Sequence, residues 1–192
     1  MADKNKVKFG LSNVHVAKLI EEDGVITYSK PFKLPGAVSL SVDPEGDTTP
    51  FYADNIKYYV AVANNGYTGD LEIVKIPEQF LTEILGQERD VNGAIIESST
   101  NINSRFALMG EIDGDVKKRR FVYYDCTAAR PGSEMSTTEE SVEPQTDTLS
   151  ITMAARNSDN IVKAIIEPDE TNQTIYNTFF AKVYEKNATA EI

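Results

Sequence analysis

Hydrophobic and polar residues alternate most clearly along residues 35–77. Alternation with a period of two runs through three segments, residues 37–42, 56–63 and 71–76. This period is typical of a β-strand with one buried face. Asn65-Gly66 stands between the last two segments and predicts a two-residue hairpin turn, because both central positions of such a turn need positive φ. Residues 43–55 predict a much longer loop between the first two strands, and a loop longer than its turn requires is expected to contact another surface.

The same alternation recurs along most of the chain. Further strands are expected at residues 13–20, 25–28, 105–112, 117–127, 146–155 and 160–166, with a short edge segment between Pro31 and Pro35, a hairpin around Asn92-Gly93 and a last strand at 181–184. Turn residues separate these segments about every 8–12 residues. The sequence therefore predicts a mainly β fold, an antiparallel β-sandwich or partly closed barrel with one or two short helices.

The helices are expected where the spacing of apolar residues changes. The first, residues 77–85, carries its apolar side chains on one stripe: Phe80, Leu81, Ile84 and Leu85. Pro77 suits the first helical position and Gly86 the left-handed position after the end. Residues 171–180 are a weaker candidate, because their threonines lower helix propensity.

One domain, residues 1–192, is expected to hold these elements. Its appendages are an N-terminal arm at 1–12, the long loop at 43–55, a mobile loop poor in apolar residues at 128–144, and a C-terminal tail at 185–192. Hydrophobic residues make up 41% of the chain, and a chain of this length buries roughly 70% of its unfolded surface.

The formal net charge of −11 argues against a groove that grips nucleic acid, since such a groove would neutralise phosphates. The single cysteine excludes an intramolecular disulfide framework and indicates a reducing compartment. No apolar run approaches about 20 residues, so no membrane-spanning segment is expected. Residues 1–9 do not resemble a signal peptide.

No group of residues in the chain has a recognisable catalytic or cofactor-binding pattern. His15 and Cys126 lie on predicted strands and are expected to be structural. Four acidic residues are spaced in part like a calcium loop: Asp43, Glu45, Asp47 and Asp54. The glycine of that register stands at the fourth position instead of the sixth, so the sharp turn is misplaced. We therefore predict no enzyme activity, no catalytic residue, no metal site and no cofactor.

A basic run follows the turn at Asp113-Gly114. It consists of Lys117, Lys118, Arg119 and Arg120. Such a run is usually a solvated strand end. The alternative is a basic patch that meets an acidic surface on a neighbouring copy.

Several segments of the chain together resemble the major tail proteins of long, non-contractile-tailed bacteriophages, the subunits of the tail tube. These segments are residues 6–11 (KVKFGL), 13–17 (NVHVA), 34–40 (LPGAVSL), 44–47 (PEGD), 51–55 (FYADN), 67–72 (YTGDLE), 123–128 (YYDCTA) and 143–146 (EPQT). None is a catalytic motif, so the specificity lies in the length of the match, which is weakest at residues 90–104 and after residue 159.

The resemblance implies a structural virion protein that assembles into stacked hexameric rings, the conduit for DNA ejection. It implies that one sheet of each subunit joins its neighbours around the channel and that a long loop reaches the next ring. The implied partners are further copies of the chain, the tape-measure protein, and tail-terminator or tail-tip proteins, with genomic DNA passing through unbound. The implied location is the virion tail, after assembly in the host bacterial cytoplasm.

Two sets of residues are candidates for these roles. The stacking loop would comprise Asp43, Pro44, Glu45, Gly46, Asp47, Pro50, Phe51, Tyr52 and Asp54. The channel wall would comprise Ser39, Ser41, Thr148, Ser150 and Thr152. The alternative for the first set is a loop that merely covers the edge of its own domain. The alternative for the second set is an ordinary solvent-exposed face of the sheet. A different function also stays open, that of a virion decoration or receptor-binding β-sandwich with an aromatic surface around Tyr58, Tyr59 and Tyr67.

Overall fold

The computed structural model describes residues 10–46, 48–53, 55–113, 117–132, 137 and 145–187, and for residues 48–53 and 57–62 it describes the backbone only. The strands in this part are β1 Leu11–Glu22, β2 Val25–Tyr28, β3 Phe32–Lys33, β4 Ala37–Glu45, β5 Thr48–Ala53, β6 Ile56–Val62, β7 Gly66–Ile73, β8 Glu88–Arg89, β9 Ile95–Ile96, β10 Phe106–Ile112, β11 Arg120–Ala128, β12 Asp147–Ala154 and β13 Lys163–Ile166. The helices are α1 Glu78–Glu83 and α2 Gln173–Asn177.

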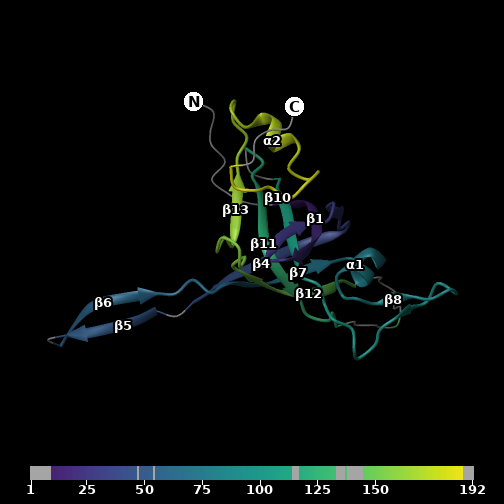
Figure 1. Cartoon of the computed structure of the whole chain (residues 1–192), viewed down its shortest axis with the longest axis horizontal. Helices are drawn as coiled ribbons and strands as arrows, with labels where there is room; N and C mark the ends of the chain where they lie inside the picture. Colours follow the sequence, from purple (N-terminus) through teal and green to yellow (C-terminus); the bar gives the residue numbers. More distant parts are fainter. Residues whose placement is uncertain are drawn as a thin grey trace.

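The main antiparallel sheet divides at β11. Its strands follow the order β2-β1-β10-β11-β12-β7-β4, with β3 paired to β1 and β13 paired to β11 (Figure 1). The first half of β11 pairs with β13, from Arg120 to Tyr123, whereas its last residues, from Asp125 to Ala128, pair with β12. Because two strands share one edge, the β12-β7-β4 branch separates from β13 and packs against the β1-β10-β11 branch.

Hydrophobic side chains of the two branches meet in the larger core. Val16 and Leu108 contribute from one branch, Leu71 and Leu149 from the other, and all four are buried. Helix α1 adds Phe80 to the same cluster. The predicted antiparallel β-sandwich with two short helices is therefore confirmed.

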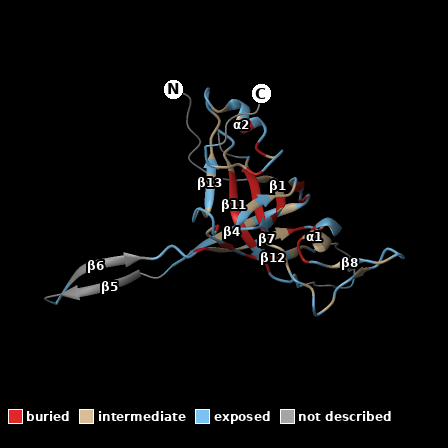
Figure 2. Ribbon diagram, in the orientation of Figure 1, coloured by how far each residue is buried: buried red, intermediate tan, exposed pale blue. Residues whose placement is uncertain are grey.

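A second core lies on the other face of β10 and β11, beneath α2 and the residues that follow it. Phe179 and Val183 pack there with Met109, Val122 and Tyr124. Both central strands are consequently buried on both faces, as the continuous red ribbons of Figure 2 show. The predicted last strand at 181–184 is wrong: these residues form no strand, and Val183 and Tyr184 pack on the face of β10 and β11 instead.

The connection between β4 and β7 differs most from the prediction. Residues 43–55 do not form one loop: β4 continues to Glu45, and β5 pairs with β6 in a separate two-stranded ribbon. We call this ribbon, residues 48–62, the arm. The predicted hairpin turn at Asn65-Gly66 is also wrong, since β7 pairs with β4 and β12 instead of β6.

The conformation of Gly66 explains why the Asn65-Gly66 dipeptide wrongly predicted a hairpin turn. Its φ is +97°, as a hairpin glycine would require, but it serves as the first residue of β7. A Cβ atom at this position would lie 2.1 Å from the carbonyl oxygen of Met153 in β12. The glycine therefore permits a close approach between two strands that are far apart in the sequence.

The sequence assigned three appendages to the domain besides the long loop: an N-terminal arm, a mobile loop and a C-terminal tail. Leu11 and Ser12, assigned to the N-terminal arm by the sequence, belong to β1, and residues 1–9 lie outside the described residues. Of the predicted mobile loop at 128–144, residues 133–136 and 138–144 also lie outside them. In the predicted tail, Glu185 is held by Arg156 at 2.7 Å, while residues 188–192 are again not described.

A buried ion pair ties α2 to the central strands. The Nε atom of Arg120 donates a hydrogen bond to Glu111 Oε2 at 2.7 Å, and Glu111 is only 4% exposed. The guanidinium of Arg120 also donates to the carbonyl oxygen of Tyr176 and lies over its ring at 3.8 Å. The pair therefore joins β10, β11 and α2.

Replacing Arg120 with Met is expected to lower the free energy of unfolding by about 3 kcal/mol, because Glu111 would be left buried without its cation. Urea denaturation followed by circular dichroism measures the change. The double variant Glu111→Gln/Arg120→Met should recover part of the loss, since it removes the uncompensated charge. A loss below about 1 kcal/mol in the single variant would contradict this account of the pair.

Candidate functional site

The outward side of the β4-β7-β12 branch carries a continuous polar surface. We call it the hydroxyl–acid face and define it by Ser39, Ser41 and Asp43 of β4, Thr68, Asp70 and Glu72 of β7, and Thr148, Ser150 and Thr152 of β12. The side chains on the other side of β7 and β12 fill the larger core, which is why alternate residues remain outside. None of the nine face residues is basic.

Strand register arranges these residues in three rows across the branch. The rows are Ser39–Glu72–Thr148, Ser41–Asp70–Ser150 and Asp43–Thr68–Thr152. Each row therefore combines one carboxylate with two hydroxyls. A groove of about 440 Å³ hollows the surface between Asp43, Asp70 and Thr127.

Hydroxyl groups hold two of the carboxylates in place. Glu72 accepts hydrogen bonds from the hydroxyls of Thr146 at 2.7 Å and Ser39 at 3.0 Å. Asp70 accepts one from Ser150 at 2.7 Å. The hydrogen bond from Thr146, followed by that from Ser39, lowers the pKa of Glu72 below its ordinary value. Any stability gained from these bonds is present above the ordinary pKa and is lost as the pH falls through the lowered one.

Replacing Thr146 with Val is expected to raise the pKa of Glu72, because the hydroxyl stabilises the ionised carboxylate. An NMR titration of the side-chain carboxyl measures the shift. Thr148→Val is the matched control, since Thr148 stands beside Glu72 in the same row without a described hydrogen bond to it. Equal shifts in both variants would contradict the role of Thr146.

The structure brings all five predicted wall residues onto the hydroxyl–acid face. The sequence predicted a strand at residues 71–76 but did not place it between β4 and β12, and it began that strand at Leu71, whereas β7 begins at Gly66. Extending the alternation backwards through Gly69 would have found Thr68 and Asp70. The missed residues include Asp70 and Glu72, two of the three carboxylates on the face.

The predicted stacking residues occupy two different elements. Asp43, Pro44 and Glu45 belong to β4, whereas Pro50, Phe51 and Tyr52 belong to β5 of the arm. Gly46 follows the end of β4, and Asp47 and Asp54 lie outside the described residues.

The arm leaves the body at Gly46 and projects along the long axis of the molecule (Figure 1). A Cβ atom on Gly46 would lie 1.9 Å from the carbonyl oxygen of Ala63, so this junction requires glycine. On the body side, the backbone N–H of Asn65 donates to the carbonyl oxygen of Glu45 at 2.9 Å. In the part of the chain that the structure describes, β5 and β6 form a sheet of their own.

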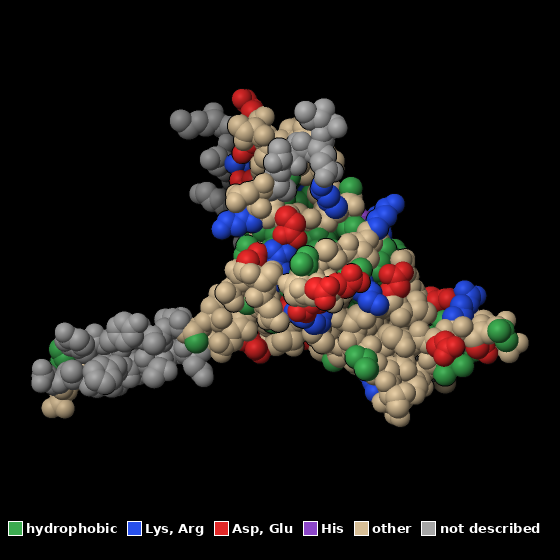
Figure 3. Space-filling model, in the orientation of Figure 1, with side chains coloured by type: hydrophobic (Ala, Val, Ile, Leu, Met, Phe, Trp, Pro, Cys, Tyr) green, Lys and Arg blue, Asp and Glu red, His purple; other side chains and the backbone are tan. Residues whose placement is uncertain are grey.

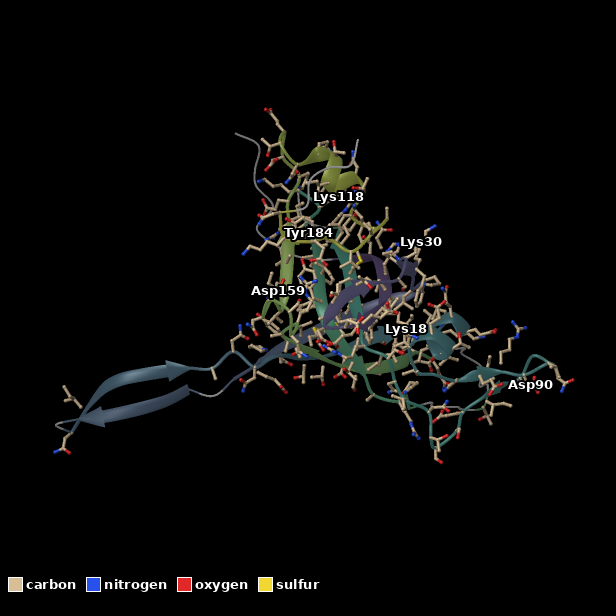
Figure 4. All side chains as sticks on the ribbon, viewed as in Figure 1. Lys18, Lys30, Asp90, Lys118, Asp159 and Tyr184 are labelled. Atoms are coloured by element: carbon tan, nitrogen blue, oxygen red, sulfur yellow. The ribbon has the colours of Figure 1, made fainter. Side chains whose placement is uncertain are left out.

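The basic run finds partners within the chain. Lys117 lies 2.8 Å from Glu167 and Lys118 lies 3.4 Å from Asp113, while Arg120 pairs with Glu111. Arg119 is 3.6 Å from the same Glu167. Figure 4 places Lys118 beside α2, and Figure 3 shows acidic and basic side chains interspersed over the body. A contact between this run and an acidic surface of a neighbouring copy stays a prediction. The same basic side chains already form ion pairs within the chain, and such a contact would compete with these pairs.

His15 and Cys126 both lie within the folded body. The ring of His15 stacks on Phe180 with centroids 4.7 Å apart, and its Nδ1 lies 2.7 Å from the carbonyl oxygen of Asn13. Cys126 is fully buried, and burial raises the pKa of its thiol, which suppresses the reactive thiolate.

The described residues contain no group of three or more His, Cys, Asp or Glu side chains placed to hold a metal ion. No helix in the same part of the chain has the length and apolar character needed to cross a membrane.

Comparison with models of known protein families gives a match over nearly the whole sequence. A family model described as "Phage tail tube protein" matches residues 3–192. No curated protein matches the chain.

Several solved structures are similar to the chain at 12% identity. They include the cap of the anti-feeding prophage, which covers 88% of this chain and 98% of that one with a TM-score of 0.49. The second is the sheath–tube complex of an extracellular contractile injection system in its extended state. The match covers 85% of this chain and 95% of that one, with a TM-score of 0.48. The third is the anti-feeding prophage baseplate. The match covers 84% of this chain and 97% of that one, with a TM-score of 0.44.

Proposed function

The chain belongs to the family of phage tail tube proteins, and from that premise we propose that its copies assemble into stacked hexameric rings that form the conduit for DNA ejection. The family match carries this proposal, because it spans residues 3–192. The family makes the chain a structural component of the virion tail. We infer that it acts through assembly and not as an enzyme.

The hydroxyl–acid face is the proposed channel wall. Its carboxylates would repel the phosphates of passing DNA, and it offers no lysine or arginine to hold them. Hydrogen bonds from Thr146 and Ser39 support this role because they keep the charge of Glu72 fixed and in place.

Free strand edges support the joining of subunits within a ring. Among the described strands, β4 pairs only with β7, and β13 pairs only with β11. Each therefore has one edge whose backbone N–H and C=O groups form no hydrogen bonds with another described strand. In a free monomer such an exposed edge can pair with the edge of another chain. Pairing between copies would satisfy them and extend the wall around the channel.

The arm is the proposed link between successive rings. It projects away from the body (Figure 1), and its two strands pair only with each other in the described structure. A contact of one copy's arm with the next copy is heterologous and does not close on itself, which generates a filament.

The remaining partners follow from a tube role. A tape-measure protein would occupy the channel during assembly, and tail-terminator or tail-tip proteins would cap the ends. Assembly is proposed to take place in the host bacterial cytoplasm.

The alternative of a decoration or receptor-binding protein has less support. The sequence suggested Tyr58, Tyr59 and Tyr67 as an aromatic binding surface for that function. Tyr67 lies on the body in edge-to-face contact with Tyr123, with centroids 5.8 Å apart, whereas Tyr58 and Tyr59 belong to β6 of the arm.

Negative-stain microscopy of the purified chain over a range of concentrations tests the proposal. Rings or tubes should appear and lengthen as the concentration rises. Particles that remain monomeric at every concentration would contradict it. A defined small oligomer that never extends would favour the alternative function.

A further inference from the structure

The arm is apolar for an element that projects from its body. In the sequences of β5 and β6, TTPFYA and IKYYVAV, Lys57 is the one charged residue, and Asp54, in the connection between the two strands, is the other charged residue of the arm. Ile56, at the start of β6, is 61% exposed. A two-stranded ribbon alone is marginally stable in water. In the described structure the two strands of this aromatic ribbon pair only with each other. We therefore expect the ribbon to be stabilised by packing against another apolar surface.

An apolar groove of about 620 Å³ lies on the same molecule beside α1. Its walls include Pro35 and Gly36 before β4, Val74 after β7, Leu81 of α1 and Ile95 of β9. Val74 is 54% exposed, so the groove presents an uncovered aliphatic side chain.

The groove is built on a rigid junction. The backbone N–H of Val74 donates to the carbonyl oxygen of Gly36 at 2.8 Å. Gly36 has a φ of +84°, and a Cβ there would approach the Val74 Cβ to 3.2 Å. This wall of the groove therefore depends on glycine and is held in place before any partner arrives.

The arm and the groove lie at opposite ends of one ladder. β4 and β7 pair from Ala37↔Ile73 to Glu45↔Gly66, with a single irregularity near the start. The groove adjoins the first pair and the arm follows the last. Nine residues of strand span about 30 Å, and the arm points away from α1, which lines the groove (Figure 1). The arm therefore cannot fill the groove of its own chain.

We propose that the arm of one copy docks its Ile56 end into the groove beside Val74 of a second copy. The inference rests on the proposed function, because it names the surface that receives the arm in the assembled tube. A protrusion and its receptor at opposite ends of one ladder give a head-to-tail contact, which repeats without closing. The apolar arm and the exposed Val74 would be buried together.

Disulfide trapping in the full chain tests the contact. The variant Ile56→Cys/Val74→Cys should form a ladder of linked multimers on a non-reducing gel after mild oxidation, and the ladder should collapse with reductant. The native Cys126 is fully buried and does not compete. The matched control is Ile56→Cys/Val25→Cys, since Val25 is an exposed valine of β2, 62% accessible. A ladder in the control but not in the test variant would overturn the proposal.

A second pair of variants separates this contact from the tube role. Val74→Asp should abolish tubes and Val25→Asp should not, with thermal unfolding used to verify that both remain folded. Tubes of normal length from Val74→Asp would contradict docking of the arm in the groove but would still agree with the proposed tube function. A ladder from the Ile56→Cys/Val74→Cys variant, together with no tubes from the wild-type chain at any concentration, would support the groove contact and overturn the tube function. Absence of both ladder and tubes would overturn both.

Discussion

A chain in which residues 46–65 are replaced by Asn-Gly is expected to fold normally and to form no tubes. Glu45 and Gly66 are cross-strand partners, so a two-residue turn can join them directly. The deletion removes the arm, whose strands form a sheet separate from the body. We expect the thermal midpoint to change by only a few degrees or less, about 1 kcal/mol. Negative-stain microscopy at the highest soluble concentration measures assembly.

The β8–β9 hairpin provides the control for this deletion. Val91 at its turn is fully exposed, and Val91→Ser changes a surface residue without touching the arm. This variant should form tubes of normal length. Tubes of normal length from the shortened chain would contradict the stacking role of the arm, whereas separate rings would show that the arm serves stacking and not ring closure.

Reversing charge on the hydroxyl–acid face is expected to create DNA binding. Asp70→Lys/Glu72→Lys places two lysines in the middle strand of the face, where each can neutralise a phosphate. Duplex DNA affinity, measured by fluorescence anisotropy, should become detectable and should fall about tenfold between about 50 and about 200 mM salt, as expected for two phosphate contacts. The unmodified chain should bind no DNA under the same conditions.

The matched control for charge reversal is Glu88→Lys/Glu170→Lys. Both residues are exposed, and both lie outside the face. The two double variants have the same net charge, so any difference between them reflects position. Equal DNA affinity in both would contradict a special role for the face and would attribute binding to net charge alone.

Local patterns in the sequence predicted several elements correctly. The alternation at 146–155 produced β12, with Leu149, Ile151 and Met153 buried on its inner side. The apolar stripe between Pro77 and Gly86 produced α1. These elements were predictable because their signals lie within a few residues and the core only has to accept one face of each.

Strand pairing was not predictable in the same way. Asn65-Gly66 has the composition of a hairpin turn, yet the partner that requires glycine there is Met153, almost ninety residues away. Similarly, β5 was hidden in a segment of proline and acidic residues, because an arm that packs on no described core leaves no buried face to produce a pattern.

The sequence by itself determined the fold class, the alternation that faces Ser39, Ser41, Thr148, Ser150 and Thr152 outwards, and the family. Only the tertiary structure decided that β7 lies between β4 and β12 and so adds Asp70 and Glu72 to one surface. It alone also placed the arm and the groove at opposite ends of that ladder. The physical reason is that periodicity reports which side of a strand is buried, whereas the choice of neighbouring strand depends on contacts between residues distant in the chain.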